Sequence, residues 1–199
     1  MKKIDDYQKI FDRYDNMMRA KQLQEERILY RPLQKLIEQG YVKKVRYGYY
    51  QWLDSEDFSE AATVIHLFPD AIFCRETALQ YYGYSDRTPA EWHLAVSKNS
   101  GKSRFRINYP HVKPHYVAPS YLEIGLVTGE IDGHKARIYD RERVICDCLR
   151  YRNKMDKEIL NRAIQGYATD AGKNVPKLLE YTKYLRVERA AKDLIGVWV

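Results

Sequence analysis

Apolar residues in the first forty positions recur at intervals of three and four, the spacing that places them on one face of an α-helix. The pattern predicts a first helix over 4–14, then a short second helix that begins at 15–16, where Asp-Asn suits an N-cap, and ends near 24–26. A third helix is expected to carry Pro32 in its first turn and to stop at Gly40. The apolar positions that would point inward from this third helix are Leu33, Leu36 and Ile37.

Two β-prone runs follow Gly40 at once. Residues 41–45 and 49–53 are rich in Tyr, Val and Trp, and the segment 46–48 between them, Arg-Tyr-Gly, has the composition of a turn. The sequence therefore predicts a β-hairpin. Three short helices followed by a basic hairpin is the element order of a winged helix-turn-helix, so residues 1–53 are expected to form a domain of that kind.

The remainder of the chain predicts a second domain over 60–199, because the acidic, polar segment 54–59 is typical of a domain boundary. This domain is expected to be α+β, with a mainly antiparallel sheet and C-terminal helices. The helices are predicted at 60–67, 76–82, 142–151, 157–167, 175–185 and 188–194. The strands are predicted at 71–74, 91–96, 104–107, 112–118, 122–128 and 135–139.

The composition narrows the choice of partner. Lysine and arginine number 34 against 27 for aspartate and glutamate, so the net charge is +7 and the pI about 9.1, which favours an anionic partner. Cys74, Cys146 and Cys148 lack the spacing of a structural zinc site and indicate reduced thiols. The N-terminus has no apolar signal segment, and no apolar run approaches the ~18 residues of a transmembrane helix. A soluble, cytoplasmic protein is therefore expected.

Positive charge concentrates between positions 27 and 50, where Glu38 is the only acidic residue. A protein that binds double-stranded DNA presents side chains of one helix to base edges in the major groove, while flanking cations neutralise phosphates. Arg31 and Gln34 are expected to contact bases, because arginine pairs well with guanine and glutamine with adenine. The hairpin cations suit phosphates or the minor groove. The predicted DNA-binding residues are Arg27, Tyr30, Arg31, Gln34, Lys35, Lys43, Lys44, Arg46 and Tyr47. The alternative is that these charges lie on solvated faces of an unrelated helical domain.

Two motifs resemble parts of catalytic or metal sites without completing them. The segment 100–103, Ser-Gly-Lys-Ser, ends like a phosphate-binding loop, but Val96 stands where that loop needs a glycine. His111 and His115 are four residues apart, yet a proline precedes each and makes the segment extended. They therefore do not form the helical histidine pair of zinc hydrolases.

The acidic residues near position 140 favour a structural role. Asp140 is well placed to cap a helix that starts at Arg141, and Asp147 can pair with Arg143 or Arg150 one turn away. Since no nucleophile, base or set of metal ligands is clustered, the sequence predicts neither an enzyme nor a cofactor or metal site.

Three blocks of the sequence carry a family resemblance: LQKLIEQGYVKKVRYGYYQW, AIFCRETALQYYGYSDRTPAEWHLAVSK and RIYDRERVICDCLRYRNKMDKEIL. Together they resemble the AbiEi family of antitoxins, over about residues 10–185. The resemblance implies a winged helix-turn-helix that binds the operon's own promoter. It also implies a C-terminal domain that counters a nucleotidyltransferase toxin, AbiEii, in a type IV system where no stable complex is required. Many members have a glycine and a small hydroxyl residue before the second helix, where this chain has Asn16-Met17-Met18.

The resemblance gives a possible role to a second basic run. In the family setting, these cations would form an antitoxin surface that engages RNA or the toxin: Arg141, Arg143, Arg150, Arg152 and Lys154. Otherwise such a run is an ordinary solvated helix face.

The expected function is a non-enzymatic transcriptional autorepressor and antitoxin of an abortive-infection system. One winged helix buries a modest area, so a monomer or weak dimer is expected to pair on inverted repeats in promoter DNA. Two alternatives stay open at this point. One is a stand-alone regulator whose second domain senses a small ligand; the other is an enzyme, such as a nuclease, to which the basic segment delivers substrate.

Overall fold

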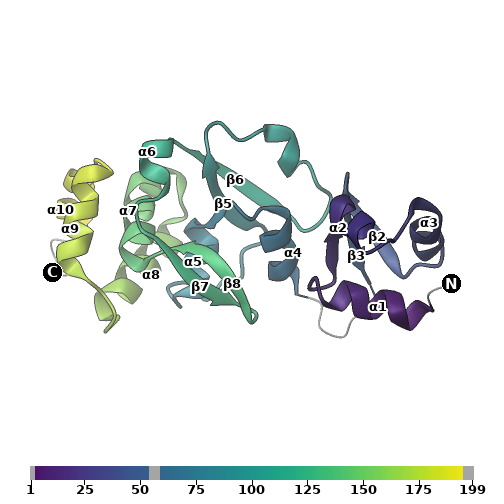
Figure 1. Cartoon of the computed structure of the whole chain (residues 1–199). Coiled ribbons are helices and arrows are strands. Elements are labelled where there is room, and N and C mark those ends of the chain that lie inside the picture. The colour runs from purple at the N-terminus through teal and green to yellow at the C-terminus, as the bar shows by residue number, and fades with distance from the viewer. Residues whose placement is uncertain (1–2, 54–58, 195–199) are drawn as a thin grey trace. The chain divides into compact units, whose positions relative to one another are not determined.

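The computed structural model describes residues 3–53 and 59–194, which belong to two compact units (Figure 1). The first unit comprises Met1–Pro69 with Ile107–Pro110, and the second comprises Asp70–Arg106 with His111–Val199. The first unit thus extends beyond the expected domain end at 53 and includes the helix at 60–67. Most of the expected boundary, 54–58, lies outside the described residues. Both units combine helices with strands, which confirms the α+β class.

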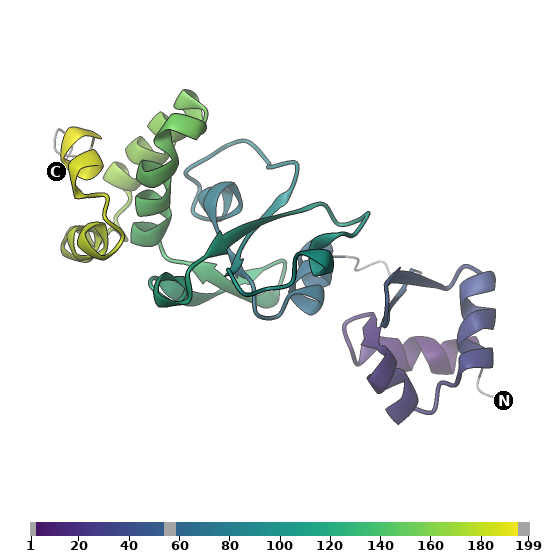
Figure 2. The ribbon, with the colours of Figure 1, turned by 90° about the horizontal axis from the view of Figure 1, so that it is seen from above.

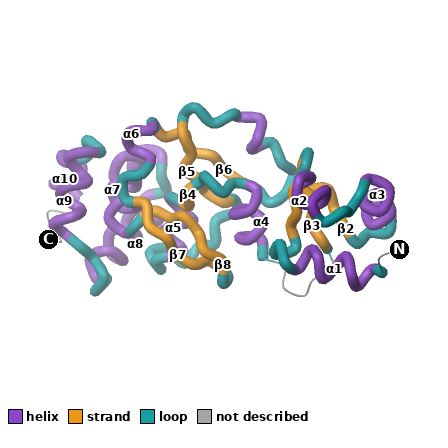
Figure 3. Tube along the Cα trace, viewed as in Figure 1, coloured by secondary structure: helices purple, strands orange, loops and turns teal. Residues whose placement is uncertain are grey.

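The first unit contains both helices and a small antiparallel sheet. Its elements are α1 (Ile4–Asp12), β1 (Met17–Arg19), α2 (Ala20–Glu25), α3 (Tyr30–Glu38), β2 (Val42–Arg46), β3 (Tyr49–Trp52) and α4 (Glu60–Leu67). These strands, drawn in orange in Figure 3, form one sheet in the order β1-β3-β2. The structure therefore contains the helix predicted at 4–14, the helix around Pro32 and the hairpin at 41–53, with ends shifted by at most two residues.

Strand β1 was not expected from the sequence. Asp15 and Asn16 adopt positive φ angles of 49° and 61°, a conformation that Asp and Asn tolerate better than most residues. They reverse the chain after α1 and do not cap α2, which begins later, at Ala20. Met17 and Met18 then pair with β3 and are buried. The prediction of a helix from 16 was wrong because three residues are too few to display a strand period.

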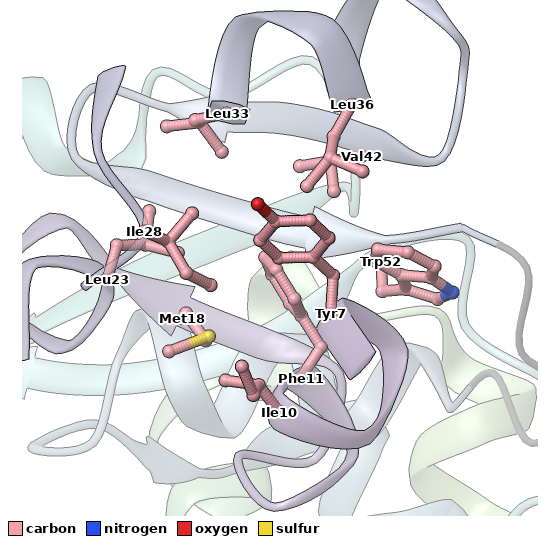
Figure 4. Packing of buried hydrophobic residues seen from close by; sticks show 10 residues of the cluster. All are labelled: Tyr7, Ile10, Phe11, Met18, Leu23, Ile28, Leu33, Leu36, Val42 and Trp52. Atoms are coloured by element: carbon pink, nitrogen blue, oxygen red, sulfur yellow. The ribbon is translucent and has the colours of Figure 1, made fainter. Parts of the chain in front are cut away.

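An aromatic cluster fixes the packing of the first unit (Figure 4). The indole of Trp52 is fully buried, with the Phe11 ring centroid at 5.4 Å and the Tyr41 ring stacked at 5.7 Å. Leu33 and Leu36 of α3 belong to the same buried cluster. Because α3 must bury this side, its opposite side faces solvent.

The second unit is built on a larger sheet with helices around it (Figure 2). Its elements are β4 (Ile72–Phe73), α5 (Arg75–Tyr81), β5 (Trp92–Ser97), the 3-10 helix η1 (Lys102–Phe105), β6 (Val112–Val117), α6 (Pro119–Leu122), β7 (Leu126–Ile131), β8 (His134–Tyr139), α7 (Arg141–Tyr151), the 3-10 helix η2 (Arg152–Lys154), α8 (Lys157–Thr169), α9 (Val175–Tyr184) and α10 (Glu188–Leu194). The strand order is β6-β5-β4-β8-β7.

The sheet of the second unit is mixed, not mainly antiparallel. Neighbours β4–β5 and β7–β8 are antiparallel, whereas β4–β8 and β5–β6 are parallel. No strand forms at 104–107: the first two of these residues belong to η1, and the other two have no regular secondary structure. Parallel pairing joins segments far apart in the chain, and local residue patterns do not encode which distant strand becomes the neighbour.

Several helices begin at the polar residues that the sequence offers as caps. The Asp140 carboxylate accepts a hydrogen bond from the backbone N–H of Arg143 at 2.8 Å, and Ser59 Oγ accepts one from Ala62 at 3.1 Å. The Asp140 cap was predicted, and each cap satisfies a donor that the helix itself leaves unpaired. No helix in the described ranges is both long and apolar enough to cross a membrane.

A pair of histidines joins the parallel strands β5 and β6. His115 Nε2 lies 3.2 Å from His93 Nδ1, and His93 is almost fully buried. Burial lowers the pKa of His93 to about 4 and that of His115 to about 3, aided by the nearby cations Lys113 and Arg75. Both rings are therefore neutral near pH 7, and one ring donates a hydrogen bond to the other.

This pair predicts acid sensitivity. In the unfolded chain each histidine titrates near pH 6.5, whereas the folded state resists protonation until the pH is much lower. The pair's stabilising contribution is therefore full above about pH 6.5 and is lost as the pH falls towards 4, by up to about 1.4 kcal/mol per pH unit for each ring. Urea unfolding followed by circular dichroism between pH 4.5 and 7 should show this loss.

The matched variants are His93→Gln and His115→Gln, since glutamine keeps a polar side chain but does not titrate. Each should show a shallower fall in stability over the same pH interval. Carboxylates titrate alike in all three proteins, so the difference between the curves isolates the histidine. Parallel curves for wild type and both variants would contradict the prediction.

Candidate nucleic-acid interface

The outward side of α3 presents polar and cationic side chains. Tyr30 is 74% exposed, and Arg31 and Lys35 are also exposed. Gln34, between them on the helix surface, is half-buried. These positions lie opposite the buried Leu33 and Leu36, as the periodicity predicted. The helix therefore offers a solvent-facing row of the side chains expected to meet bases and phosphates.

The turn before α3 holds Arg27 in a strained conformation. Its φ angle is 57°, and the next backbone N–H, of Ile28, donates to the carbonyl of Leu23 at 2.8 Å. This closes the end of α2 in the way that a glycine normally does. Leu23 and Ile28 are buried, while Arg27 is exposed. The turn thus holds a cation in solvent just before α3.

The hairpin adds cations beside an exposed tyrosine. Lys43 and Lys44 on β2 are exposed, and Tyr47 at the turn is 92% exposed. Lys44 Nζ lies 5.5 Å from the centroid of the Tyr47 ring. Gly48 has a φ angle of 76°, which lets the chain turn tightly here. Helix α3 packs against β2, so the cations of the helix and those of the hairpin are carried by elements in direct contact.

Arg46 does not join this exposed set. Its guanidinium donates to the carbonyl oxygen of Leu67 at 2.8 Å and stacks over the rings of Tyr49 and Phe68, with centroid distances of 4.1 and 5.3 Å. Arg46 thus anchors the hairpin to the end of α4. The assignment of Arg46 to the DNA surface is corrected on this ground, since its cation is held by the protein itself.

Arg19 belongs in the set, although the sequence placed it on a helix. It lies on β1, is exposed, and has its guanidinium 5.6 Å from the Tyr49 ring centroid. The backbone N–H of Ala20 donates to the carbonyl of Gly48 at 2.8 Å, which ties the start of α2 to the hairpin turn. Only the pairing of β1 with β3 brings Arg19 to the hairpin, and the sequence pattern did not show that pairing.

Five cations on α3, its preceding turn and β2 make no ion pair with any residue that the structure describes. Elsewhere in the unit, Arg13 pairs with Glu26 at 2.9 Å and Lys21 lies 3.8 Å from Glu25. By contrast, none of the following makes an ion pair with a described residue: Arg27, Arg31, Lys35, Lys43 and Lys44. Among the described residues, positive charge without an ion-pair partner therefore gathers on one helix, one turn and one hairpin.

The basic run of the second unit is mostly engaged by the protein itself. Arg143 is buried; its guanidinium donates to Asp147 at 3.2 Å and to the carbonyl oxygens of Tyr121 and Ile124 at 2.6 and 2.7 Å. The assignment of Arg143 to an antitoxin surface is therefore wrong. The expected pairing of Asp147 with Arg143 is confirmed.

The remaining residues of that run differ in availability. Arg141 pairs with Asp170 at 2.8 Å. The hydrogen bond from Tyr84, together with the one from Arg141, lowers the pKa of Asp170 to about 2. The guanidinium of Arg150 donates to the Leu185 carbonyl, and that of Arg152 donates to its own helix at Leu149, at 2.8 Å. Lys154 is exposed. The residues of this run consequently do not form one free cationic surface.

The described residues do not assemble a metal centre: no three His, Cys, Asp or Glu side chains among them lie close enough to hold an ion. The cysteines are all buried and unbridged, and burial raises their pKa values. A high pKa keeps a thiol protonated and unreactive. The phosphate-loop-like segment 100–103 forms a turn leading into η1.

Comparison with known proteins adds no family. No protein-family model matches the chain, and no curated protein matches it significantly.

The strain at Arg27 predicts that glycine is the better backbone choice at this position. An L-residue in the left-handed region costs about 1–2 kcal/mol, and glycine avoids this cost. Part of that gain is offset, because glycine loses more conformational entropy on folding than other residues do. The Arg27→Gly variant should therefore be more stable than Arg27→Ala by about 1 kcal/mol. Urea unfolding of the two variants measures this difference.

The two variants also form a matched pair for binding, because each removes the same charge. If Arg27 serves only the turn, neither variant should change affinity for DNA. If it contributes charge to the interface, both should bind DNA more weakly by a similar factor despite their different stabilities. A stability order with alanine above glycine would refute the account of the turn.

Proposed function

We propose that the first unit is a winged helix-turn-helix that binds double-stranded DNA, with α3 as the recognition helix and the β2–β3 hairpin as the wing. The observation that carries the proposal is that five cations without an ion pair to any described residue gather on α3, its preceding turn and β2: Arg27, Arg31, Lys35, Lys43 and Lys44. The order of three helices followed by a hairpin, with β1 added to the sheet beside β3, supports the proposal. The major groove, about 12 Å wide, admits one α-helix.

Within this proposal the side chains divide by chemistry. Arg31 and Gln34 lie on the exposed side of α3 and have the planar, bidentate groups that read guanine and adenine edges. Lys43 and Lys44 supply point charges suited to phosphates, where position matters more than hydrogen-bond pattern. Tyr30 suits a phosphate contact through its hydroxyl.

The proposed role on DNA is repression of the chain's own promoter. A single module of this size buries a modest area, so two copies on inverted repeats would supply the affinity and the symmetry of an operator. The chain would then be a monomer or weak dimer in solution that pairs on DNA. No cofactor and no catalytic step enter this function.

Two substitutions separate base recognition from charge. Arg31→Ala should cost about 1–3 kcal/mol on the preferred sequence and relax the preference at the contacted base pair. Lys43→Ala should weaken binding to all sequences alike and reduce the slope of log affinity against log salt by about one. Fluorescence anisotropy with fragments of the upstream DNA and a scrambled duplex, at several salt concentrations, measures both effects.

Lys9→Ala is the control, since Lys9 is an exposed cation on α1, outside the proposed surface. It should leave sequence preference unchanged and affect the salt slope less than Lys43→Ala does. Equal behaviour of all three variants would show that only the overall charge of the protein matters. Lack of binding by the wild type at low salt would overturn the proposal.

We further propose that the chain acts as the antitoxin of a type IV system, countering a nucleotidyltransferase toxin without a stable complex. This part rests on the sequence resemblance to AbiEi antitoxins. In the second unit we assign the antitoxin surface to Arg152 and Lys154. Within the basic run, Arg152 donates a hydrogen bond to the neighbouring helix end at Leu149, and Lys154 is exposed. A stand-alone regulator is the competing function.

Rescue of growth separates these roles. Expressed from a foreign promoter, the wild type should restore growth of cells that express the neighbouring nucleotidyltransferase, and Arg31→Ala should do so equally because DNA binding is not needed. Arg152→Glu should lose rescue, while Lys183→Glu, an exposed charge reversal on α9, should keep it. Absence of rescue by the wild type would reject the antitoxin role.

A further inference from the structure

A pocket of about 360 Å³ opens in the second unit. It is lined by the start of α5, by β6, by the last turns of α7 and by residues after that helix. Its volume falls in the range of small-molecule sites in proteins. The proposed DNA contact does not use this pocket, and of the proposed antitoxin surface only Lys154 lies in its lining.

Arg75 enters the pocket from a strained backbone position. It joins β4 to α5 with a φ angle of 49°, where glycine would be the easier residue. Its guanidinium lies 3.6 Å from the centroid of the Tyr151 ring, and both residues line the pocket. Its side chain makes no ion pair with any described residue. A cation is thus held at the wall, desolvated on one face by an aromatic ring.

The other charges of the lining leave a positive balance. Lys113 pairs with Glu91 at 3.4 Å, and Asp147 pairs with Arg143 at 3.2 Å, so these two charges are compensated. The lining charges without such partners among the described residues are Arg75, Lys154 and Glu76. Two cations against one carboxylate favour an anionic ligand over a cationic one.

The rest of the wall combines hydrogen bonding with apolar contact. The neutral imidazole of His115, held by His93, can donate or accept a hydrogen bond beside the guanidinium. Pro114 and Met155 offer apolar surface to the body of a ligand. The wall thus combines charged and polar groups that can orient a small molecule with apolar surface that can contact its body.

We propose that this pocket binds a small organic anion whose carboxylate or phosphate group contacts the Arg75 guanidinium, with Lys154 at the rim. Arginine suits both groups, because its planar fork donates two parallel hydrogen bonds to either. The proposal concerns the second unit alone and does not depend on DNA binding.

The proposal is tested by titrating the full chain with inorganic phosphate and, separately, with benzoate. Binding is measured from amide chemical shifts in nuclear magnetic resonance spectra, with the ionic strength held constant by chloride. Shifts should saturate and concentrate at Arg75, His115, Tyr151 and Lys154. Arg75→Gly removes the guanidinium and relieves the backbone, so it should fold and bind about ten to a hundred times more weakly. Lys154→Gln, at an exposed position, should weaken binding severalfold.

Lys98→Gln is the control for charge, since Lys98 is exposed just past the far end of β5 and does not line the pocket. It should bind both probes as the wild type does. Saturation by phosphate alone assigns a phosphate ligand, and saturation by benzoate alone a carboxylate. The proposal is overturned if neither probe gives saturable, localised shifts, or if Arg75→Gly and Lys154→Gln bind like Lys98→Gln. Either result leaves the DNA proposal unaffected.

Discussion

Burial of one side of α3 is the constraint on which the first unit depends. Leu33 and Leu36 pack into the cluster around Trp52, and burying side chains of this size contributes about 1.5–3 kcal/mol each. Once that side is fixed inward, the helix has no freedom to hide Arg31 or Lys35. The cationic surface is therefore a consequence of core packing, and a change in the core would disturb it even without touching a charged residue.

The arginines of this chain show that residue type alone does not decide between a structural and a binding role. Arg143 and Arg46 are retained inside the protein because backbone carbonyl oxygens, and for Arg143 a carboxylate, meet their guanidinium groups. A buried charge without such partners would be costly. Arg31 has none of these partners among the described residues, so its hydrogen-bonding groups are left for water or a ligand.

The sequence predicted features that depend on local residue patterns and missed those that depend on contacts between distant segments. The helical periods around 4–14 and Pro32, the hairpin, and the cap at Asp140 are local patterns, and the structure contains them. Strand β1, the parallel neighbours of the second sheet and the engagement of Arg46 each depend on contacts with distant segments. The same holds for the pocket around Arg75, whose walls come from β6 and α7 as well as α5, so no local pattern announced it.

Positive φ angles at arginine sharpen the distinction between strain and function. Arg27, Arg75 and Arg186 all lie in the left-handed region, with φ angles of 57°, 49° and 53°. Arg186 closes α9 by the same backbone geometry that Arg27 uses after α2, and it lines neither proposed site. Strain alone therefore does not mark a site. Arg27 and Arg75 differ from Arg186 in their surroundings. Arg27 precedes α3, whose cations make no ion pair with a described residue, and Arg75 lies against an aromatic ring at the wall of a pocket.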